Sequence, residues 1–152
     1  WAGPLARAHE TADIVAAVLG LPPPTSHDGL KEKHFGAIQG IPKSELAELN
    51  PALLEQILRR NPAAEFVGGE GLDGADALRG RADLHGFAQA VQVAQHMERV
   101  LVVTHGWVLD VVTRIVSGHS RSTVLHLKPQ NGECLWVELA QQQLRKLEPA
   151  PI

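Results

Sequence analysis

His105 and Gly106 stand where a ligand could be bound. They follow the apolar run Val100–Thr104, which is typical of a buried strand. Ligands bind beyond the carboxyl ends of strands in open α/β sheets, so His105 is expected beside a ligand. Gly106 would let the backbone approach that ligand, and the helix expected after it would aim free N–H groups at an anion such as phosphate. A histidine that only caps the strand is an equally open interpretation.

Arg7 and Glu32 could complete a site for phosphoryl transfer. Arg7 falls in the first turn of an expected helix, where the helix dipole disfavours a cation and a bound anion would reverse that penalty. Its guanidinium also matches phosphate oxygens in a two-pronged contact. Glu32 lies in an irregular loop beside His34 and Phe35, a setting in which a protonated carboxyl could donate a proton. Taken singly, Arg7 is better explained as a solvated surface residue, and Glu32 as part of the charged run Lys31–Lys33.

Other motifs carry less weight. Residues 69–74, GEGLDG, match the pattern GxGxxG, but no clear strand precedes them. Glu70 and Asp73 would also repel a pyrophosphate, so we interpret this match as chance. The sequence has no HExxH, no GxSxG and no P-loop lysine, and the other histidines lack metal-ligand spacing. We therefore expect neither a metal nor a cofactor.

The elements that position these residues are predicted from periodicity and from Gly and Pro signals. The first helix is expected over Leu5–Leu19 with Gly20 as its stop, and its buried face comprises Leu5, Ala8, Ala12, Val15, Val18 and Leu19. Further helices are expected over 41–60 with a break at Asn50–Pro51, over Ala75–Arg99 and over Trp107–Val116. Residues 30–40 are expected to form an ordered loop with at most a short element, and residues 61–74 a second loop. Strands are predicted over Val100–Thr104, 134–139 and 143–147.

This inventory predicts an α/β fold. Strands that alternate with helices imply a mostly parallel sheet covered on both faces, a three-layer α/β/α arrangement. Only one convincing buried strand is present, so the sheet looks short by at least one central strand. The chain also opens on Trp1 rather than Met, a few residues before a helix signal. We therefore expect further sequence ahead of Trp1.

Composition excludes several functions. A net charge of −3 offers no basic surface for nucleic acid. The single cysteine, Cys134, rules out an internal disulfide and favours a reducing, cytoplasmic compartment. No apolar stretch approaches the roughly 20 residues that a membrane span needs. An exposed edge of the C-terminal strand pair could support a homodimer.

Three segments together resemble the histidine phosphatase superfamily, which has the phosphoglycerate-mutase-like fold. PLARAHETADIV at 4–15 resembles its S-x-L-x-R-A-x-x-T-A block, and LKEKHFGAIQG at 30–40 resembles its E-x-x-[FY]-G-x-x-x-G block. VVTHG at 102–106 resembles its second-histidine block. GGEG at 68–71 resembles the GGES turn that the family has between the E-x-x-[FY]-G-x-x-x-G block and the second-histidine block. The segments occur in the family's order. The resemblance identifies residues 1–152 as one histidine-phosphatase-like domain that is incomplete at its N-terminus.

The resemblance implies a two-step reaction on a small phosphorylated substrate. A histidine in an N-terminal R-H-G motif takes the phosphoryl group, and the phosphohistidine is then hydrolysed or passes the group on. Arg7, His105 and Gly106 would bind the phosphate, and His105 would stabilise the group in transfer. Glu32 would protonate the leaving oxygen and later activate water.

The sequence departs from the family pattern, and several functions stay open. It contains no R-H-G motif, Gly3-Pro4 replaces the serine-led lead-in, and Gly71 replaces the serine of GGES. We expect a histidine acid phosphatase-like phosphomonoesterase, because the stretch from Gly40 to His105 is short for the large substrate-covering insertion of the mutases. HFGAIQG nevertheless resembles the mutase version of its block. The alternatives are mutase-type phosphoryl transfer, a pseudophosphatase that only binds phosphorylated ligands, and an unrelated α/β protein in which His105 is structural.

Overall fold

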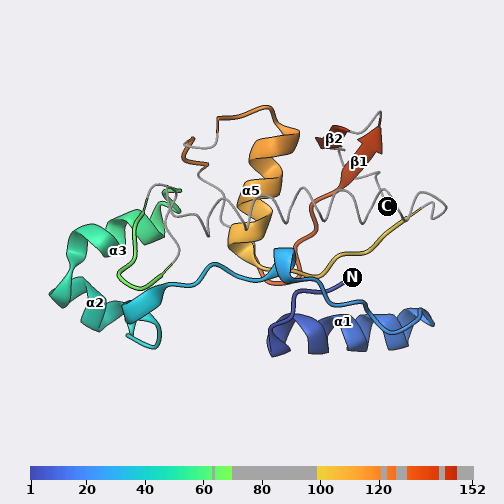
Figure 1. The fold of residues 1–152 in the computed structure, drawn as a ribbon, viewed down its shortest axis with the longest axis horizontal. Coiled ribbons are helices and arrows are strands. Elements are labelled where there is room, and N and C mark those ends of the chain that lie inside the picture. The colour runs from blue at the N-terminus through green and yellow to red at the C-terminus, as the bar shows by residue number, and fades with distance from the viewer. Residues whose placement is uncertain (63, 70–98, 121–122, 126–129, 141–142, 147–152) are drawn as a thin grey trace. The chain divides into compact units, whose positions relative to one another are not determined.

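The computed structural model describes residues 1–62, 64–69, 99–120, 123–125, 130–140 and 143–146 (Figure 1). The chain divides into two compact units. The first consists of Trp1–Lys33 and Asp73–Val108, and the second of His34–Leu72 and Leu109–Ile152. Arg7, Glu32 and His105 therefore all belong to the first unit.

In the first unit, residues 1–3 lie between two other extended segments. Ala2 forms a parallel bridge with Ser26 on one side and with Val103 on the other. The Ala2 N–H donates to the Thr25 carbonyl at 2.9 Å, and the Gly3 N–H donates to the Val103 carbonyl at 3.0 Å. Ala2 is fully buried as a result. These three residues connect the loop that leads to Glu32 with the segment that leads to His105.

The strand predicted over Val100–Thr104 is only partly formed. The segment has a single bridge, at Val103, and the expectation that the run is buried on both faces is wrong, because Leu101 is 45% exposed and Val103 half-buried. Its partner among the described residues, residues 1–3, is too short to pair with the whole run. A strand is buried on both faces only where covered neighbours flank it along its length.

Helix α1 covers Ala6–Leu19, as the periodicity predicts. Gly20 ends it in the left-handed conformation (φ 64°) and donates its N–H back to two carbonyls of the last turn, so the predicted stop is confirmed. The buried face is a stripe of small residues one turn apart, Ala8, Ala12 and Ala16. The expected face is wrong at its far end, where Val18 is 79% and Leu19 60% exposed. Val18 points away from the alanine stripe, and Leu19 lies beyond the end of the packed surface.

The loop over residues 30–40 is confirmed as ordered, with short elements only. A 3₁₀ turn, η1 (Asp28–Leu30), lies at its start in the first unit, and a second, η2 (Gly36–Ile38), lies in the second unit. The 3₁₀ geometry suits such short pieces because its hydrogen bonds are poorly aligned in longer runs.

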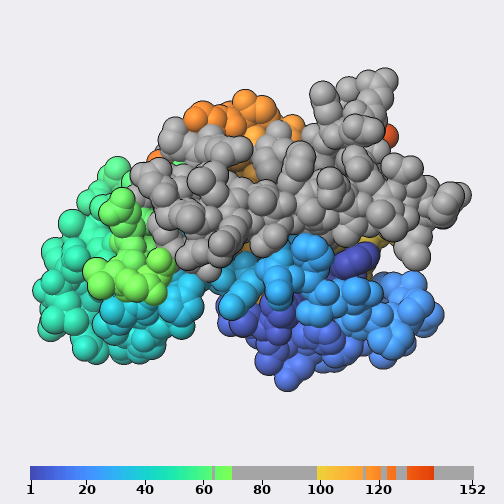
Figure 2. Space-filling view, in the orientation of Figure 1, coloured from blue at the N-terminus to red at the C-terminus, as the bar shows by residue number. Residues whose placement is uncertain are grey.

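The predicted helix break at Asn50–Pro51 is confirmed in the second unit. Helix α2 covers Lys43–Leu49 and helix α3 covers Pro51–Leu58. Pro51 starts α3 at the position where its missing N–H costs nothing, and the Asn50 side chain caps the helix by accepting from the Leu53 N–H at 3.0 Å. Figure 2 shows α2, α3 and residues 64–69 as one continuous body.

Helix α5 covers Gly106–Val116, close to the predicted range. The predicted strand pair is confirmed with shorter strands, because β1 (Val137–Ala140) and β2 (Gln143–Lys146) form an antiparallel pair. Residues 75–98 of the predicted long helix and residues 70–74 of the GxGxxG match lie outside the described residues. No described helix is both long enough and apolar enough to cross a bilayer.

Candidate functional site

His105 is a buried histidine at the start of a helix. Only 7% of it is exposed, and α5 begins at the next residue, Gly106. Burial lowers the pKa of His105, and the positive charge of Arg7 lowers it further. The imidazole is therefore neutral at pH 7. Within the part of the chain that the structure describes, its buried Nε2 atom has no hydrogen-bond partner.

Arg7 lies close enough to His105 to act on it electrostatically. It is the second residue of α1, and its side chain is exposed. The first turn of α1 holds no acidic residue that would neutralise the guanidinium. The structure thus places two of the predicted site residues near each other. No acidic residue in the first turn of α1 neutralises the charge of Arg7.

Gly3 permits a close approach between three backbone segments. A Cβ atom at position 3 would lie 2.6 Å from the Leu30 carbonyl oxygen and 3.2 Å from His105 Nε2. The same Leu30 carbonyl accepts a hydrogen bond from the Thr104 hydroxyl at 2.9 Å. The packing around His105 therefore depends on the glycine at position 3, where the family pattern has a serine. The sequence did not indicate this dependence.

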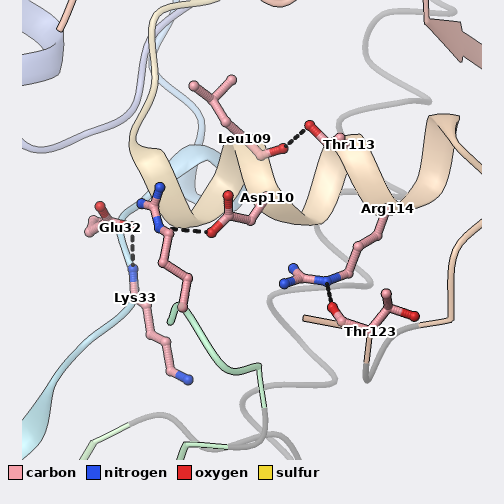
Figure 3. Close-up of polar contacts among 8 residues, drawn as sticks. Glu32, Lys33, Leu109, Asp110, Thr113, Arg114 and Thr123 are labelled. Atoms are coloured by element: carbon pink, nitrogen blue, oxygen red, sulfur yellow. Dashed lines mark hydrogen bonds and ion pairs between the residues drawn. The ribbon is translucent and has the colours of Figure 1, made fainter. Parts of the chain in front are cut away.

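Glu32 lies on a segment that is attached at two points to the start of α5 and the loop ahead of it. Leu30 accepts the Thr104 hydrogen bond, and the Lys33 ammonium lies 4.8 Å from the centre of the Trp107 ring. The half-buried Glu32 lies between these two contacts, and its Oε1 accepts from the Lys33 N–H at 3.1 Å (Figure 3). All of these residues belong to the first unit.

This arrangement can bind an anion and transfer a proton. The Arg7 guanidinium, the imidazole and the N–H groups in the first turn of α5 are donors that suit phosphate oxygens. The Glu32 carboxyl is a group that can give or take a proton. Among the described residues, no three His, Cys, Asp or Glu side chains gather as a metal site would require.

The sequence analysis missed a second buried polar cluster, which lies in the second unit. Asp110 is fully buried, and its Oδ2 lies 3.0 Å from Arg60 Nε. Arg114 is also buried and donates from Nε to the Thr123 carbonyl at 2.8 Å (Figure 3). Burial raises the pKa of Asp110 to about 6, although the charges of Arg60 and Arg114 oppose the rise. An Asp and an Arg four residues apart in an otherwise apolar helix were the available signal.

Comparison with known proteins gives consistent matches. Residues 1–149 match the family model of the histidine phosphatase superfamily, branch 1. The chain is 32% identical over 129 residues to the metal-independent phosphoserine phosphatase of Arabidopsis thaliana, covering 83% of this chain and 52% of that protein. It is 29% identical over 109 residues to phosphoglycerate mutase-like protein 4 of the same plant, covering 72% of this chain and 46% of that protein. The chain therefore spans about half the length of the curated relatives it matches.

A solved structure shares the fold. The alpha-ribazole phosphatase of Shigella flexneri superposes with a TM-score of 0.69 at 21% identity, over 95% of this chain and 69% of that one. At this identity, the likeness concerns the fold alone.

Proposed function

Because the chain belongs to the histidine phosphatase superfamily, branch 1, we propose that it hydrolyses phosphomonoesters through a phosphohistidine intermediate. The observation that carries the proposal is that Arg7 acts electrostatically on the buried, neutral His105, which directly precedes α5. The proposed fold is the family's three-layer α/β/α arrangement with a mostly parallel sheet. The parallel bridges that flank Ala2 support it.

The proposed phosphate site has two kinds of hydrogen-bond donor, one that attracts the phosphate by its charge and one that orients the phosphate oxygens. Arg7 supplies the positive charge that attracts the anion. The neutral imidazole of His105 and the N–H groups at Gly106 supply hydrogen bonds that strengthen as charge develops on the oxygens in transfer. Burial keeps the His105 ring fixed, so little reorganisation is needed during the reaction.

The proposed reaction has two balanced steps. A nucleophilic histidine forms a P–N bond while the P–O bond to the leaving group breaks, and Glu32 gives its proton to the leaving oxygen. Glu32 then takes a proton from water, the resulting hydroxide attacks phosphorus, and the P–N bond breaks to release phosphate. The nucleophile belongs to an R-H-G segment that these 152 residues do not contain, so the proposal concerns a polypeptide that includes one.

Mutase-type phosphoryl transfer is the second candidate. It is favoured by the likeness to phosphoglycerate mutase-like protein 4 and by the stretch HFGAIQG at 34–40. The two activities differ in whether the phosphoryl group goes to water or to a second hydroxyl. Phosphatase is preferred here, because the relative with the higher identity is described as a phosphatase. The substrate is proposed to be a small phosphorylated molecule, and the exposed free Cys134 favours a cytoplasmic location.

The test is hydrolysis of p-nitrophenyl phosphate by the polypeptide as it is made in its own cells, beside its His105→Ala and Arg7→Ala variants. Each variant should lose at least roughly 100-fold in kcat/KM, as expected for the loss of a group that stabilises developing charge. Acid-labile, alkali-stable phosphate on the protein after a quench would identify the phosphohistidine. Equal rates in the parent and in either variant would refute the proposed site, and phosphate binding without turnover would favour the pseudophosphatase.

A further inference from the structure

Lys33 and Trp107 form a contact that the proposed reaction does not use. The Lys33 ammonium lies 4.8 Å from the centre of the Trp107 ring, within the range of a cation–π interaction. Trp107 is buried in the first turn of α5, two residues after His105, and Lys33 directly follows Glu32. The contact therefore joins the neighbour of the proposed proton donor to the helix that begins the phosphate site.

A second contact holds the other side of Glu32. The Thr104 hydroxyl donates to the Leu30 carbonyl at 2.9 Å. Thr104 precedes His105 and Trp107 follows it by two residues, and each of them contacts the segment that contains Glu32. Glu32 has no regular secondary structure to fix it, since η1 ends at Leu30. These two side-chain contacts connect the Glu32 segment to the residues around His105.

We propose that Lys33 and Trp107 are positioning residues that hold the Glu32 carboxyl in place for proton transfer to the leaving group. The proposal rests on the proposed function, because it assumes that Glu32 is the general acid. Proton transfer needs the donor within hydrogen-bond reach of the leaving oxygen, so a small displacement of the segment lowers the rate of that step. The Lys33 backbone N–H, which donates to Glu32 Oε1 at 3.1 Å, also orients the carboxyl.

The charge of Lys33 could instead attract the substrate directly. The two roles predict different kinetics. Removal of a residue that only binds the phosphate raises KM for every phosphate ester alike. A residue that positions the acid matters only where the leaving group needs a proton.

The experiment compares two substrates in the natural polypeptide. p-Nitrophenolate leaves without protonation, whereas the alkoxide of β-glycerophosphate requires a proton. Lys33→Met should lower kcat for β-glycerophosphate about tenfold, part of the 10²–10⁴ that general acid catalysis typically supplies, and change kcat for p-nitrophenyl phosphate by less than about twofold. Lys33→Arg and Trp107→Phe retain a cation over an aromatic ring and should restore most of the β-glycerophosphate rate.

Two controls isolate the mechanism. Lys31→Met removes the same charge on the other side of Glu32 from an exposed side chain, and it should leave both substrates unchanged. In a Glu32→Gln background, Lys33→Met should have no further effect, because a positioning residue has nothing left to position.

The outcomes separate this inference from the proposed function. Equal losses on both substrates in Lys33→Met, a change confined to KM, or a full tenfold effect that persists in Glu32→Gln would each overturn the positioning role while the phosphatase stands. Hydrolysis of neither substrate by the parent polypeptide would overturn the proposed function, and this inference with it.

Discussion

His105 and Asp110 are two buried polar groups only five residues apart in sequence, and they differ in what surrounds them. Burial moves the pKa of each group toward its neutral form, lowering that of His105 and raising that of Asp110 to about 6. The positive charge of Arg7 disfavours the protonated form of His105, whereas the opposite charges of Arg60 and Arg114 favour the ionised form of Asp110. Burial alone therefore does not distinguish the two groups; the charges around them do.

The comparison assigns different tasks to the two regions. Around His105, Arg7 provides positive charge and the start of α5 provides further donors, so the region favours an anion. Around Asp110, the protein itself supplies a carboxylate that faces two guanidinium groups, which leaves one positive charge in excess. Arg60 adopts a left-handed backbone conformation (φ 53°), which costs an arginine about 1 kcal/mol, and its side chain contacts Asp110. On the proposed function, the first region serves a ligand and the second serves the fold.

The largest expected effect separates the two residues by activity. His105→Ala should lower kcat for p-nitrophenyl phosphate at least roughly 100-fold. Asp110→Ala should leave kcat per folded molecule within about threefold, because the proposed reaction does not use Asp110. Rates are measured at a temperature where urea titration shows each variant to be fully folded. A comparable loss of rate in Asp110→Ala would show that the second cluster takes part in catalysis and would end the distinction.

Stability should show the reverse order. Asp110→Ala should lower the free energy of unfolding by about 3 kcal/mol, because it empties a fully buried position and leaves the partly buried Arg60 and the buried Arg114 without the carboxylate beside them. Urea unfolding measures the loss. Glu55→Ala is the matched control, since Glu55 pairs with Arg59 at 2.6 Å on an exposed surface, and its loss should cost no more than about 0.5 kcal/mol. Similar costs for the two variants would mean that burial adds nothing to the Asp110 pair.

Local elements were predicted where the signal lies within one segment. The alanine and leucine period and Gly20 gave α1, Asn50–Pro51 gave the break between α2 and α3, and the apolar run after Gly106 gave α5. The short segment at residues 1–3 escaped prediction because two or three residues carry no period. The predicted extent of the Val100–Thr104 strand was wrong for a related reason. The length of a paired strand depends on how many residues its partner provides, and the partner here is that short segment.

The packing around the candidate site could not be predicted from the sequence. Arg7, Glu32 and His105 could be named from motifs, and their roles stay proposals. The contact of Gly3 with the Leu30 carbonyl depends on three-dimensional approach between distant segments, which no local pattern encodes. Similarly, Asp110 and Arg114 stand four residues apart and could have been noticed, but the approach of Arg60 could not.

Gly3 tests how closely the His105 region is packed, with a smaller expected effect. Gly3→Ala places a Cβ 2.6 Å from the Leu30 carbonyl oxygen, so the backbone must shift at a cost of about 1–3 kcal/mol. The added Cβ would also lie 3.2 Å from His105 Nε2, so kcat should fall as well. Urea unfolding and the p-nitrophenyl phosphate rate are measured together. A variant as stable and as active as the parent would mean that the segments do not approach so closely.

The smallest expected effect is a difference in how the two groups respond to pH. The pKa of His105 is lower in the folded than in the unfolded protein, where it lies near 6.5, so its contribution to stability is present above about pH 6.5 and is lost as the pH falls below that value. Asp110 behaves oppositely. Its pKa rises from 3.8 to about 6 on folding, so its contribution is present below about pH 4 and is lost as the pH rises to about 6.

Urea unfolding between pH 4 and 7.5 measures both responses as differences from the parent at each pH, so that all other titrating groups cancel. The stability deficit of Asp110→Asn should be largest near pH 4 and should shrink as the pH approaches 6, because the parent then bears the cost of ionising a buried carboxyl. The deficit of His105→Ala should be largest above pH 6.5 and should shrink as the pH falls, because the parent then bears the cost of burying an imidazole whose charged form is disfavoured. Parallel trends in the two variants would show that the two groups titrate in similar surroundings, and the contrast between the proposed ligand site and the Asp110 cluster would not hold.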